Sequence, residues 1–81
     1  MRPHFSERFT TSYSAAPAEI QRAFDRKLAL LLANLRHPSL HAKKYDEARD
    51  VWQARASRGW RFYFRIRGNV YELIDIAAHP K

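Results

Sequence analysis

Positively charged and aromatic side chains alternate along one short stretch of this chain. Between residues 60 and 67 the positions fall into two sets, Trp60, Phe62, Phe64 and Ile66 in one and Arg61, Tyr63, Arg65 and Arg67 in the other. Successive side chains of a β-strand point to opposite faces, so the pattern predicts a strand with one apolar and one cationic face. Guanidinium groups match phosphate oxygens two at a time, and a tyrosine ring offers a surface on which a base can stack. The cationic face is therefore a candidate surface for binding nucleic acid.

A neighbouring strand is expected to extend this surface with Gln53 and Arg55. Adjacent strands lie about 4.8 Å apart, so the arginines of the two strands would share one patch. Such arginines repel each other, and a purely structural sheet usually interleaves acids. Only Glu72 and Asp75 could do so here, and alternation places them on opposite faces, so at most one is expected to neutralise the patch. The alternative is a solvated polar face on which the arginines merely cluster.

Metal-independent cleavage of RNA needs a base for the 2′-hydroxyl proton, cations for the transition state and an acid for the leaving 5′-oxygen. His79 follows the last predicted strand at the rim of the sheet, and histidine exchanges protons readily near neutral pH. His41 lies near Lys43 and Lys44, from where it could reach the patch. The alternative for His79 is an idle surface residue. No pair of histidines has the spacing of zinc ligands with a closing carboxylate, which argues against a metal site.

The elements that must position these residues follow from periodicity and turns. Strands are predicted over residues 51–56, 60–67 and 70–77, joined by tight turns at Ser57–Gly59 and Gly68–Asn69. A helix of about 17 residues is predicted after Pro17, because apolar residues recur at helical spacing and proline is tolerated in a first turn. The apolar stripe consists of Ile20, Phe24, Leu28, Leu31, Leu32 and Leu35. The Trp60/Phe62/Phe64/Ile66 face is its only place of burial.

The remaining segments complete the predicted fold. Residues 4–13 favour a short strand, His37–Pro38 ends the helix, and residues 39–50 form a polar connection anchored by Leu40 and Tyr45. The fold class is thus α+β, with an N-terminal helix, preceded or not by a short strand, on a three- to four-stranded antiparallel sheet. At 81 residues a single domain is expected to span the whole chain, 1–81.

Composition limits the functions that fit. The 15 Lys and Arg residues against 8 Asp and Glu give a net charge of +7, which favours nucleic acid, an anionic membrane or an acidic protein as partner, unless the protein is merely basic. The absence of cysteine excludes disulfides and thiolate metal sites and suits a reducing compartment. No apolar run approaches the roughly 20 residues of a membrane span, and the first residues lack the apolar segment of a signal peptide, so a cytosolic protein is expected.

From about Ala18 to His79 the chain resembles the RelE/ParE superfamily of bacterial type II toxins, and within it the RelE/YafQ-like mRNA interferases. The resemblance is carried by HPSLHAKK at residues 37–44, VWQARASRGWRFYFRI at 51–66 and IDIAAH at 74–79. Each motif is short, but their order and spacing follow the family pattern. That pattern implies a RelE-like fold.

The resemblance also implies residue roles. Arg61 matches the arginine that contacts the scissile phosphate, and His79 matches the C-terminal catalytic histidine of YafQ-like members. Arg55 and Gln53 fall where RelE-like members have lysines, so one cation is lost, and Lys44 matches a basic residue of the link. The full candidate site has His79, Arg61 and Arg55 as catalytic residues, Lys43, Lys44, Arg65, Tyr63 and Arg49 as RNA-binding residues, and no metal.

The function implied is a ribosome-dependent endoribonuclease that cuts mRNA in the decoding site, inhibits translation, needs no cofactor and acts in the cytoplasm. A cognate antitoxin would silence it by laying an acidic or amphipathic segment across the basic face. Two alternatives stay open at this point. ParE-like relatives share the fold but poison DNA gyrase without a nuclease site. A relic that only binds its antitoxin would keep the same surface.

Overall fold

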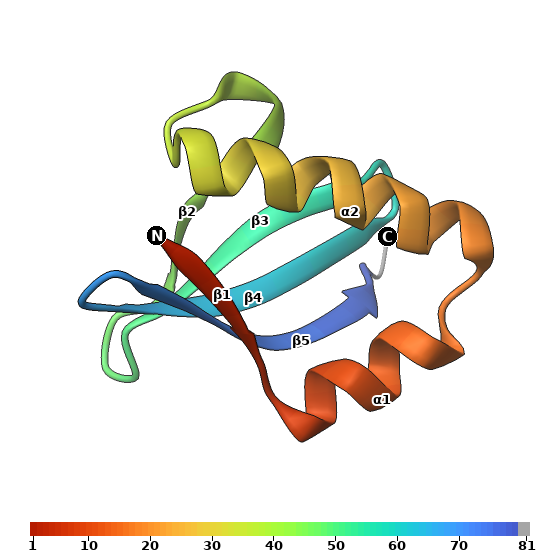
Figure 1. Ribbon diagram of the computed structural model, residues 1–81, viewed down its shortest axis with the longest axis horizontal. Coiled ribbons are helices and arrows are strands. Elements are labelled where there is room, and N and C mark those ends of the chain that lie inside the picture. The colour runs from red at the N-terminus through yellow and green to blue at the C-terminus, as the bar shows by residue number, and fades with distance from the viewer. Residues whose placement is uncertain (80–81) are drawn as a thin grey trace.

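The computed structural model describes residues 1–79 and places two helices on one face of a five-stranded sheet (Figure 1). The helices are α1 (Glu7–Ala15) and α2 (Ala18–Ala33), followed by the short 3₁₀ helix η1 (Pro38–Leu40). The strands are β1 (Arg2–Phe5), β2 (Lys43–Asp46), β3 (Val51–Ser57), β4 (Trp60–Arg67) and β5 (Val70–Ala78). Their order in space is β1-β5-β4-β3-β2.

The predicted α+β class and the antiparallel meander of β3, β4 and β5 are confirmed. Two differences concern the edges of the sheet. β2 pairs antiparallel with β3, and β1 pairs parallel with β5, so the sheet is mixed and has one strand more than the largest number expected. Neither edge strand exceeds 4 residues, which is too short for a clear period-2 pattern in the sequence.

The core lies between α2 and the sheet. Phe24 of α2 stands edge-on to Phe62 of β4, with ring centroids 5.0 Å apart. Phe62 and Phe64 are fully buried, whereas Trp60 and Ile66 at the ends of the predicted apolar face are half-buried. Each aromatic ring removed from water contributes roughly 1.5–3 kcal/mol, so this stripe holds α2 on the sheet as the sequence predicted.

The prediction of a strand over residues 4–13 was wrong beyond Phe5, because α1 begins there. The hydroxyl of Ser6 accepts a hydrogen bond from the backbone N–H of Phe9 at 3.0 Å, which caps the helix. Phe9 and Tyr13 are four residues apart and stack with centroids 5.9 Å apart, as neighbours on a helix do. The aromatic content of the segment therefore serves a helix face rather than a strand.

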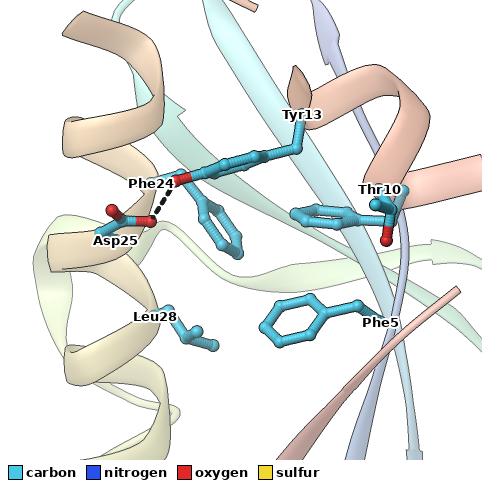
Figure 2. Close-up of a pocket in the computed structure, with 7 residues that line it drawn as sticks. Phe5, Thr10, Tyr13, Phe24, Asp25 and Leu28 are labelled. Carbon is cyan, nitrogen blue, oxygen red and sulfur yellow. Dashed lines mark hydrogen bonds between the residues drawn. The ribbon is translucent and has the colours of Figure 1, made fainter. Parts of the chain in front are cut away.

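Aromatic rings also join α1 to α2 (Figure 2). The ring of Phe9 lies 5.4 Å from that of Phe5 and 5.0 Å from that of Phe24. The hydroxyl of Tyr13 donates a hydrogen bond to Asp25 at 2.8 Å, and burial together with this bond raises the pKa of Tyr13. A hollow of about 310 Å³ remains among these side chains. The cluster fixes α1 against α2 on the same side of the sheet.

A β-bulge interrupts β5. Tyr63 of β4 pairs with Asp75 and the next residue, Phe64, pairs with Leu73, so Ile74 is an extra residue in β5. The extra residue changes the alternation of side chains after it. Glu72 and Asp75 consequently lie on one face of the sheet, the face of their cross-strand partners Arg65 and Tyr63. The prediction that they lie on opposite faces was wrong, because plain alternation takes no account of a bulge.

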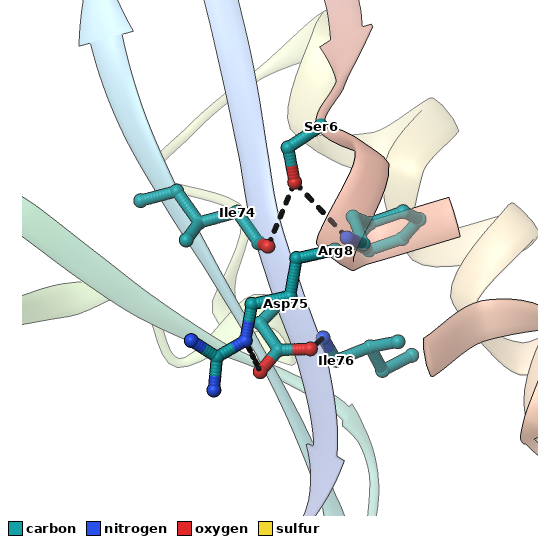
Figure 3. A network of polar contacts seen from close by, with 6 residues as sticks. Ser6, Arg8, Ile74, Asp75 and Ile76 are labelled. Atoms are coloured by element: carbon teal, nitrogen blue, oxygen red, sulfur yellow. Dashed lines mark hydrogen bonds and ion pairs between the residues drawn. The ribbon is translucent and has the colours of Figure 1, made fainter. Parts of the chain in front are cut away.

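The start of α1 is bonded to this bulge (Figure 3). The hydroxyl of Ser6 donates to the backbone carbonyl of Ile74 at 2.9 Å, in addition to capping the helix. Arg8 donates from Nε to one oxygen of Asp75 at 3.1 Å, and the other oxygen accepts the backbone N–H of Ile76 at 2.9 Å. These contacts link residues nearly 70 positions apart and hold Asp75 on the cationic face.

The connection between α2 and β3 contains more structure than expected. Leu40 is fully buried, which confirms it as an anchor. Tyr45 is 61% exposed, so its prediction as a second anchor was wrong. It belongs to β2, where the pairing shifts between Lys44 and Asp46 and leaves Tyr45 as the extra residue of a second bulge. Its ring lies against Tyr63 on the cationic face instead of in the core.

Candidate functional site

The face of the sheet away from α2 carries no helix within residues 1–79 (Figure 1). Arg55 of β3 pairs directly with Arg61 of β4, and Gln53 pairs with Tyr63. The amide of Gln53 donates to the Tyr63 hydroxyl at 3.3 Å, which ties the two strands together on this side. The cationic face predicted from alternation is therefore formed.

A concave pocket of about 400 Å³ lies at one end of this face. It is lined by His41, Ala42, Lys43, Gln53, Arg55, Arg61 and His79, which include no carboxylate. His79 follows β5, Arg61 is on β4, Arg55 is on β3, and His41 precedes β2. Because these strands are consecutive in the sheet, the two histidines stand on opposite sides of the arginine pair.

The turn between β3 and β4 fixes Arg61. Its Nη1 atom donates to the backbone carbonyls of Ser57, Arg58 and Trp60 at 3.2, 3.3 and 3.1 Å. The backbone N–H of His79 donates to the carbonyl of Gly59 in the same turn at 2.7 Å. One tight turn thus holds both the arginine and the histidine. The turn that the sequence predicts at Ser57–Gly59 therefore also positions two residues of the pocket.

Arg55 has no ion-pair partner within residues 1–79. Its Nε atom is buried and has no hydrogen-bond partner among the residues that the structure describes. The positive charge also acts on Lys27 of α2, whose pKa is lowered by burial and then by the charges of Arg55 and Arg26. Lys27 donates from Nζ to the carbonyl of Ser39 at 2.9 Å.

Carboxylates lie around the pocket rather than in it. In residues 1–79 the ion pairs join Arg8 to Asp75 (3.1 Å), Lys44 to Glu47 (3.9 Å) and Asp50 (2.6 Å), Arg49 to Asp46 (3.8 Å), and Arg67 to Glu72 (2.6 Å). None of these pairs includes Lys43, Arg55, Arg61 or Arg65. A cationic pocket without an internal counterion is a site that attracts anions.

The structure separates Lys44 from the other predicted residues. Lys44 pairs in register with Trp52, and its Nζ atom lies 5.2 Å from the centre of the Trp52 ring, which stacks on the buried Phe64. Its hydrogen bond with Asp50 raises the pKa of Lys44 and lowers that of Asp50. Lys44 thus belongs to the α2 side of the sheet, and it does not line the pocket.

The other predicted RNA-binding residues lie farther along the cationic face. Arg49, Tyr63 and Arg65 line a second hollow of about 320 Å³, where Arg65 donates from Nε to the carbonyl of Arg49 at 3.0 Å. The predicted RNA-binding residues did not include the other residues of this hollow, among them Tyr45 and Arg8. The strand that carries Tyr45 has only 4 residues, which is too short for a clear alternation signal. Arg8 reaches the face only through its contact with the β5 bulge, for which the sequence carries no local signal.

In the described part of the chain, no group of three or more His, Cys, Asp or Glu side chains is arranged to hold a metal ion. The helices within residues 1–79 are too short and too polar for any of them to cross a membrane.

Several solved structures share this fold. The YoeB/ParE toxin from Agrobacterium tumefaciens has a TM-score of 0.82 at 14% identity, over 99% of this chain and 100% of that one. YafQ from Escherichia coli BL21(DE3) has a TM-score of 0.78 at 12% identity, over 94% and 90% of the two chains. RelE in the RelB–RelE antitoxin–toxin complex from Methanococcus jannaschii has a TM-score of 0.76 at 13% identity, over 91% and 87%.

Sequence comparison adds no closer relationship, because no family model and no curated protein matches the chain. The structural agreement extends over nearly the whole chain at low identity, so it concerns the fold. The RelE-like fold expected from the sequence is confirmed: the chain has the fold of the YoeB, YafQ and RelE structures.

Proposed function

We propose that this protein is the toxin of a type II toxin–antitoxin system and that it cuts mRNA on the ribosome, which inhibits translation. The observation that carries the proposal is the pocket in which Arg55 and Arg61 lie between His41 and His79, with no Asp or Glu among its lining residues within 1–79. The fold shared with RelE, YafQ and YoeB supports the toxin class. The proposed place of action is the cytoplasm.

The order of residues across the pocket fits an in-line displacement at phosphorus. The ribose 2′-oxygen attacks from one side and the 5′-oxygen leaves from the other, so the base and the acid are needed on opposite sides. His79 and His41 have this relation to the arginine pair. One imidazole takes the 2′-hydroxyl proton as the O2′–P bond forms, and the other gives a proton to O5′ as the P–O5′ bond breaks. The products are a 2′,3′-cyclic phosphate and a 5′-hydroxyl end.

The arginines stabilise the charge that develops during this step. Arg61 is held by three backbone carbonyls, so its guanidinium group is fixed before RNA arrives, and Arg55 stands opposite it as a second cation. Fixed donors of this kind typically contribute on the order of 10²- to 10³-fold to the rate. Lys43 at the rim of the pocket and Arg49, Tyr63 and Arg65 beyond it hold the RNA. Lys44 has no part in this proposal because it lies on the other side of the sheet.

An antitoxin is the proposed protein partner. The net charge of +7 and the pocket without a counterion among residues 1–79 suit an acidic segment that covers the pocket. The M. jannaschii structure, in which a protein of this fold is bound to an antitoxin, supports such a partner. The antitoxin and the RNA would compete for the same arginines, so binding of the one excludes the other.

Induction of the protein in growing bacteria, followed by mapping of mRNA 5′ ends, tests the proposal. Cuts in phase with codons are expected, together with loss of protein synthesis. His79→Ala should abolish the cuts, whereas His4→Ala, which removes an exposed histidine on β1 at the far edge of the sheet, should not. Intact mRNA with DNA-damage signalling would instead favour the ParE-like alternative, and absence of any effect would favour a relic.

A further inference from the structure

The second hollow on the cationic face contains a pair of aromatic rings, Tyr45 and Tyr63, of which Tyr45 is largely exposed. Tyr45 is 61% exposed, and its ring centroid lies 5.1 Å from that of Tyr63 at an interplanar angle of 61°. Tyr45 is also the extra residue of the β2 bulge, and bulges often re-aim a side chain next to a functional site. A ring left this exposed adds little to the core and is free to take a planar ligand.

The charges of the second hollow differ from those of the pocket. Two of its arginines are partnered by acids, Arg8 by Asp75 at 3.1 Å and Arg49 by Asp46 at 3.8 Å. Among the described residues, the pocket holds cations without any acid. A phosphate therefore prefers the pocket, whereas the second hollow offers fewer unpaired charges and the exposed ring of Tyr45.

The two hollows adjoin each other. Gln53 lines the pocket and Tyr63 lines the second hollow, and these two side chains are hydrogen-bonded at 3.3 Å. Arg61 and Tyr63 are two residues apart on one face of β4, which is about 7 Å along a strand. This separation is on the scale of a single nucleotide. A nucleotide strand whose phosphate lies on Arg61 would thus bring a neighbouring base to Tyr63.

We propose that Tyr45 and Tyr63 form a nucleobase subsite, in which the base next to the scissile phosphate stacks on the exposed ring of Tyr45. This inference rests on the proposed function, since it takes single-stranded RNA as the ligand. Stacking on an aromatic side chain is tolerant of sequence, because every base has a π-face. The subsite would therefore set the register of the RNA relative to Arg55 and Arg61.

The test uses the whole protein and a short single-stranded RNA whose 2′-O-methyl groups prevent cleavage. A set of such RNAs is used, each with 2-aminopurine at a different position, because the fluorescence of this base is quenched when it stacks. We expect strong quenching at one position, retained in Tyr45→Phe and lost in Tyr45→Ala. The affinity should fall about 5- to 150-fold in Tyr45→Ala, the range for loss of one stacked base. An abasic nucleotide at that position should make Tyr45→Ala and the unchanged protein bind equally.

Other outcomes overturn the subsite. If Tyr45→Ala shows the same quenching and the same RNA affinity as the unchanged protein, no base stacks on Tyr45. The same conclusion follows if Tyr45→Ala weakens binding of the antitoxin but not binding of RNA. Cleavage of unmodified mRNA on ribosomes, measured in parallel, separates this result from the proposed function. If the unchanged protein cleaves mRNA and Tyr45→Ala has no effect on RNA binding, the subsite is overturned and the proposed function is not. Position-specific quenching without cleavage supports the subsite and overturns the nuclease.

Discussion

Arg55 and Arg61 stand directly opposite each other on β3 and β4, and none of the described residues brings a carboxylate into the pocket that they line. Like charges in direct cross-strand positions destabilise a sheet. The buried and unpartnered Nε atom of Arg55 adds a further cost. Such an arrangement is expected where the energy that is lost in folding is recovered when an anion binds.

Arg55→Met should therefore make the protein more stable and less active. Met keeps the unbranched stem but removes the charge, so the free energy of unfolding should rise by roughly 0.2–1 kcal/mol, the usual size of a cross-strand pair effect. RNA cleavage should fall on the order of 10²-fold. Urea unfolding measures the first change and mRNA cleavage the second. Arg22→Met, on the exposed side of α2, is the matched control. A large loss of stability in Arg55→Met would show that the arginine is structural.

Ser6→Ala should loosen the N-terminal helix. The hydroxyl both caps α1 through Phe9 and donates to the carbonyl of Ile74, so its loss removes two hydrogen bonds. We expect the free energy of unfolding to fall by about 1–2 kcal/mol. Ser14→Ala, at an exposed position near the end of the same helix, should change it far less. Equal effects of the two substitutions would contradict the role given to Ser6.

The Lys44–Asp50 pair gives a pH dependence of known sign. The hydrogen bond from Lys44 lowers the pKa of the Asp50 carboxyl. The stabilisation is thus present above the ordinary carboxyl pKa and is lost as the pH falls through the lowered value. The pKa of Lys44 is raised, so its contribution is lost only at alkaline pH, as the pH rises through that raised value.

An NMR titration of the Asp50 carboxyl tests this pair. Lys44→Met should return the pKa of Asp50 toward its ordinary value. Lys43→Met, which removes a neighbouring lysine that pairs in register with Gln53 rather than Trp52, should leave it low. The same pKa in Lys44→Met and in the unchanged protein would rule out the hydrogen bond as the cause.

Salt dependence of RNA binding should distinguish the two lysines. Each phosphate contact with single-stranded nucleic acid adds about 0.7 to the slope of log affinity against log salt. Lys43→Gln should reduce the slope by about this amount, because Lys43 lines the pocket. Lys44→Gln should leave it unchanged, because Lys44 is paired with Asp50 on the other side of the sheet. Fluorescence anisotropy at several salt concentrations gives both slopes, and a reversed order would refute the placement of the lysines.

Periodicity and turn residues predicted the helix α2 and the strands β3, β4 and β5, because these elements depend mainly on neighbouring residues. The alternation in β4 and the turns on either side of it depend on neighbouring residues, so the meander and the Arg55–Arg61 pair followed from them. The apolar stripe of α2 was equally clear. The gathering of His79, Arg61 and Arg55 in one pocket is a direct consequence of that meander.

Features that depend on distant contacts were not predictable in this way. The bulge in β5 is bonded to Ser6 and Arg8, nearly 70 residues away, and it decides the face on which Asp75 lies. The placement of Lys44 and Tyr45 depends on the pairing of β2 with β3, and a strand of 4 residues is too short for the sequence to predict that pairing. The sequence therefore predicted a group of cations of which most lie on one face of the sheet, whereas Lys44 lies on the other.

Cleavage by the purified protein on ribosomes programmed with a defined mRNA tests the central claim most directly. The unchanged protein and His4→Ala should cut at discrete positions and leave 5′-hydroxyl ends. Arg61→Ala should cut on the order of 10²- to 10³-fold more slowly, and His79→Ala on the order of 10²- to 10⁴-fold. Intact mRNA with the unchanged protein, or cutting at an unchanged rate by both pocket variants, would contradict the account.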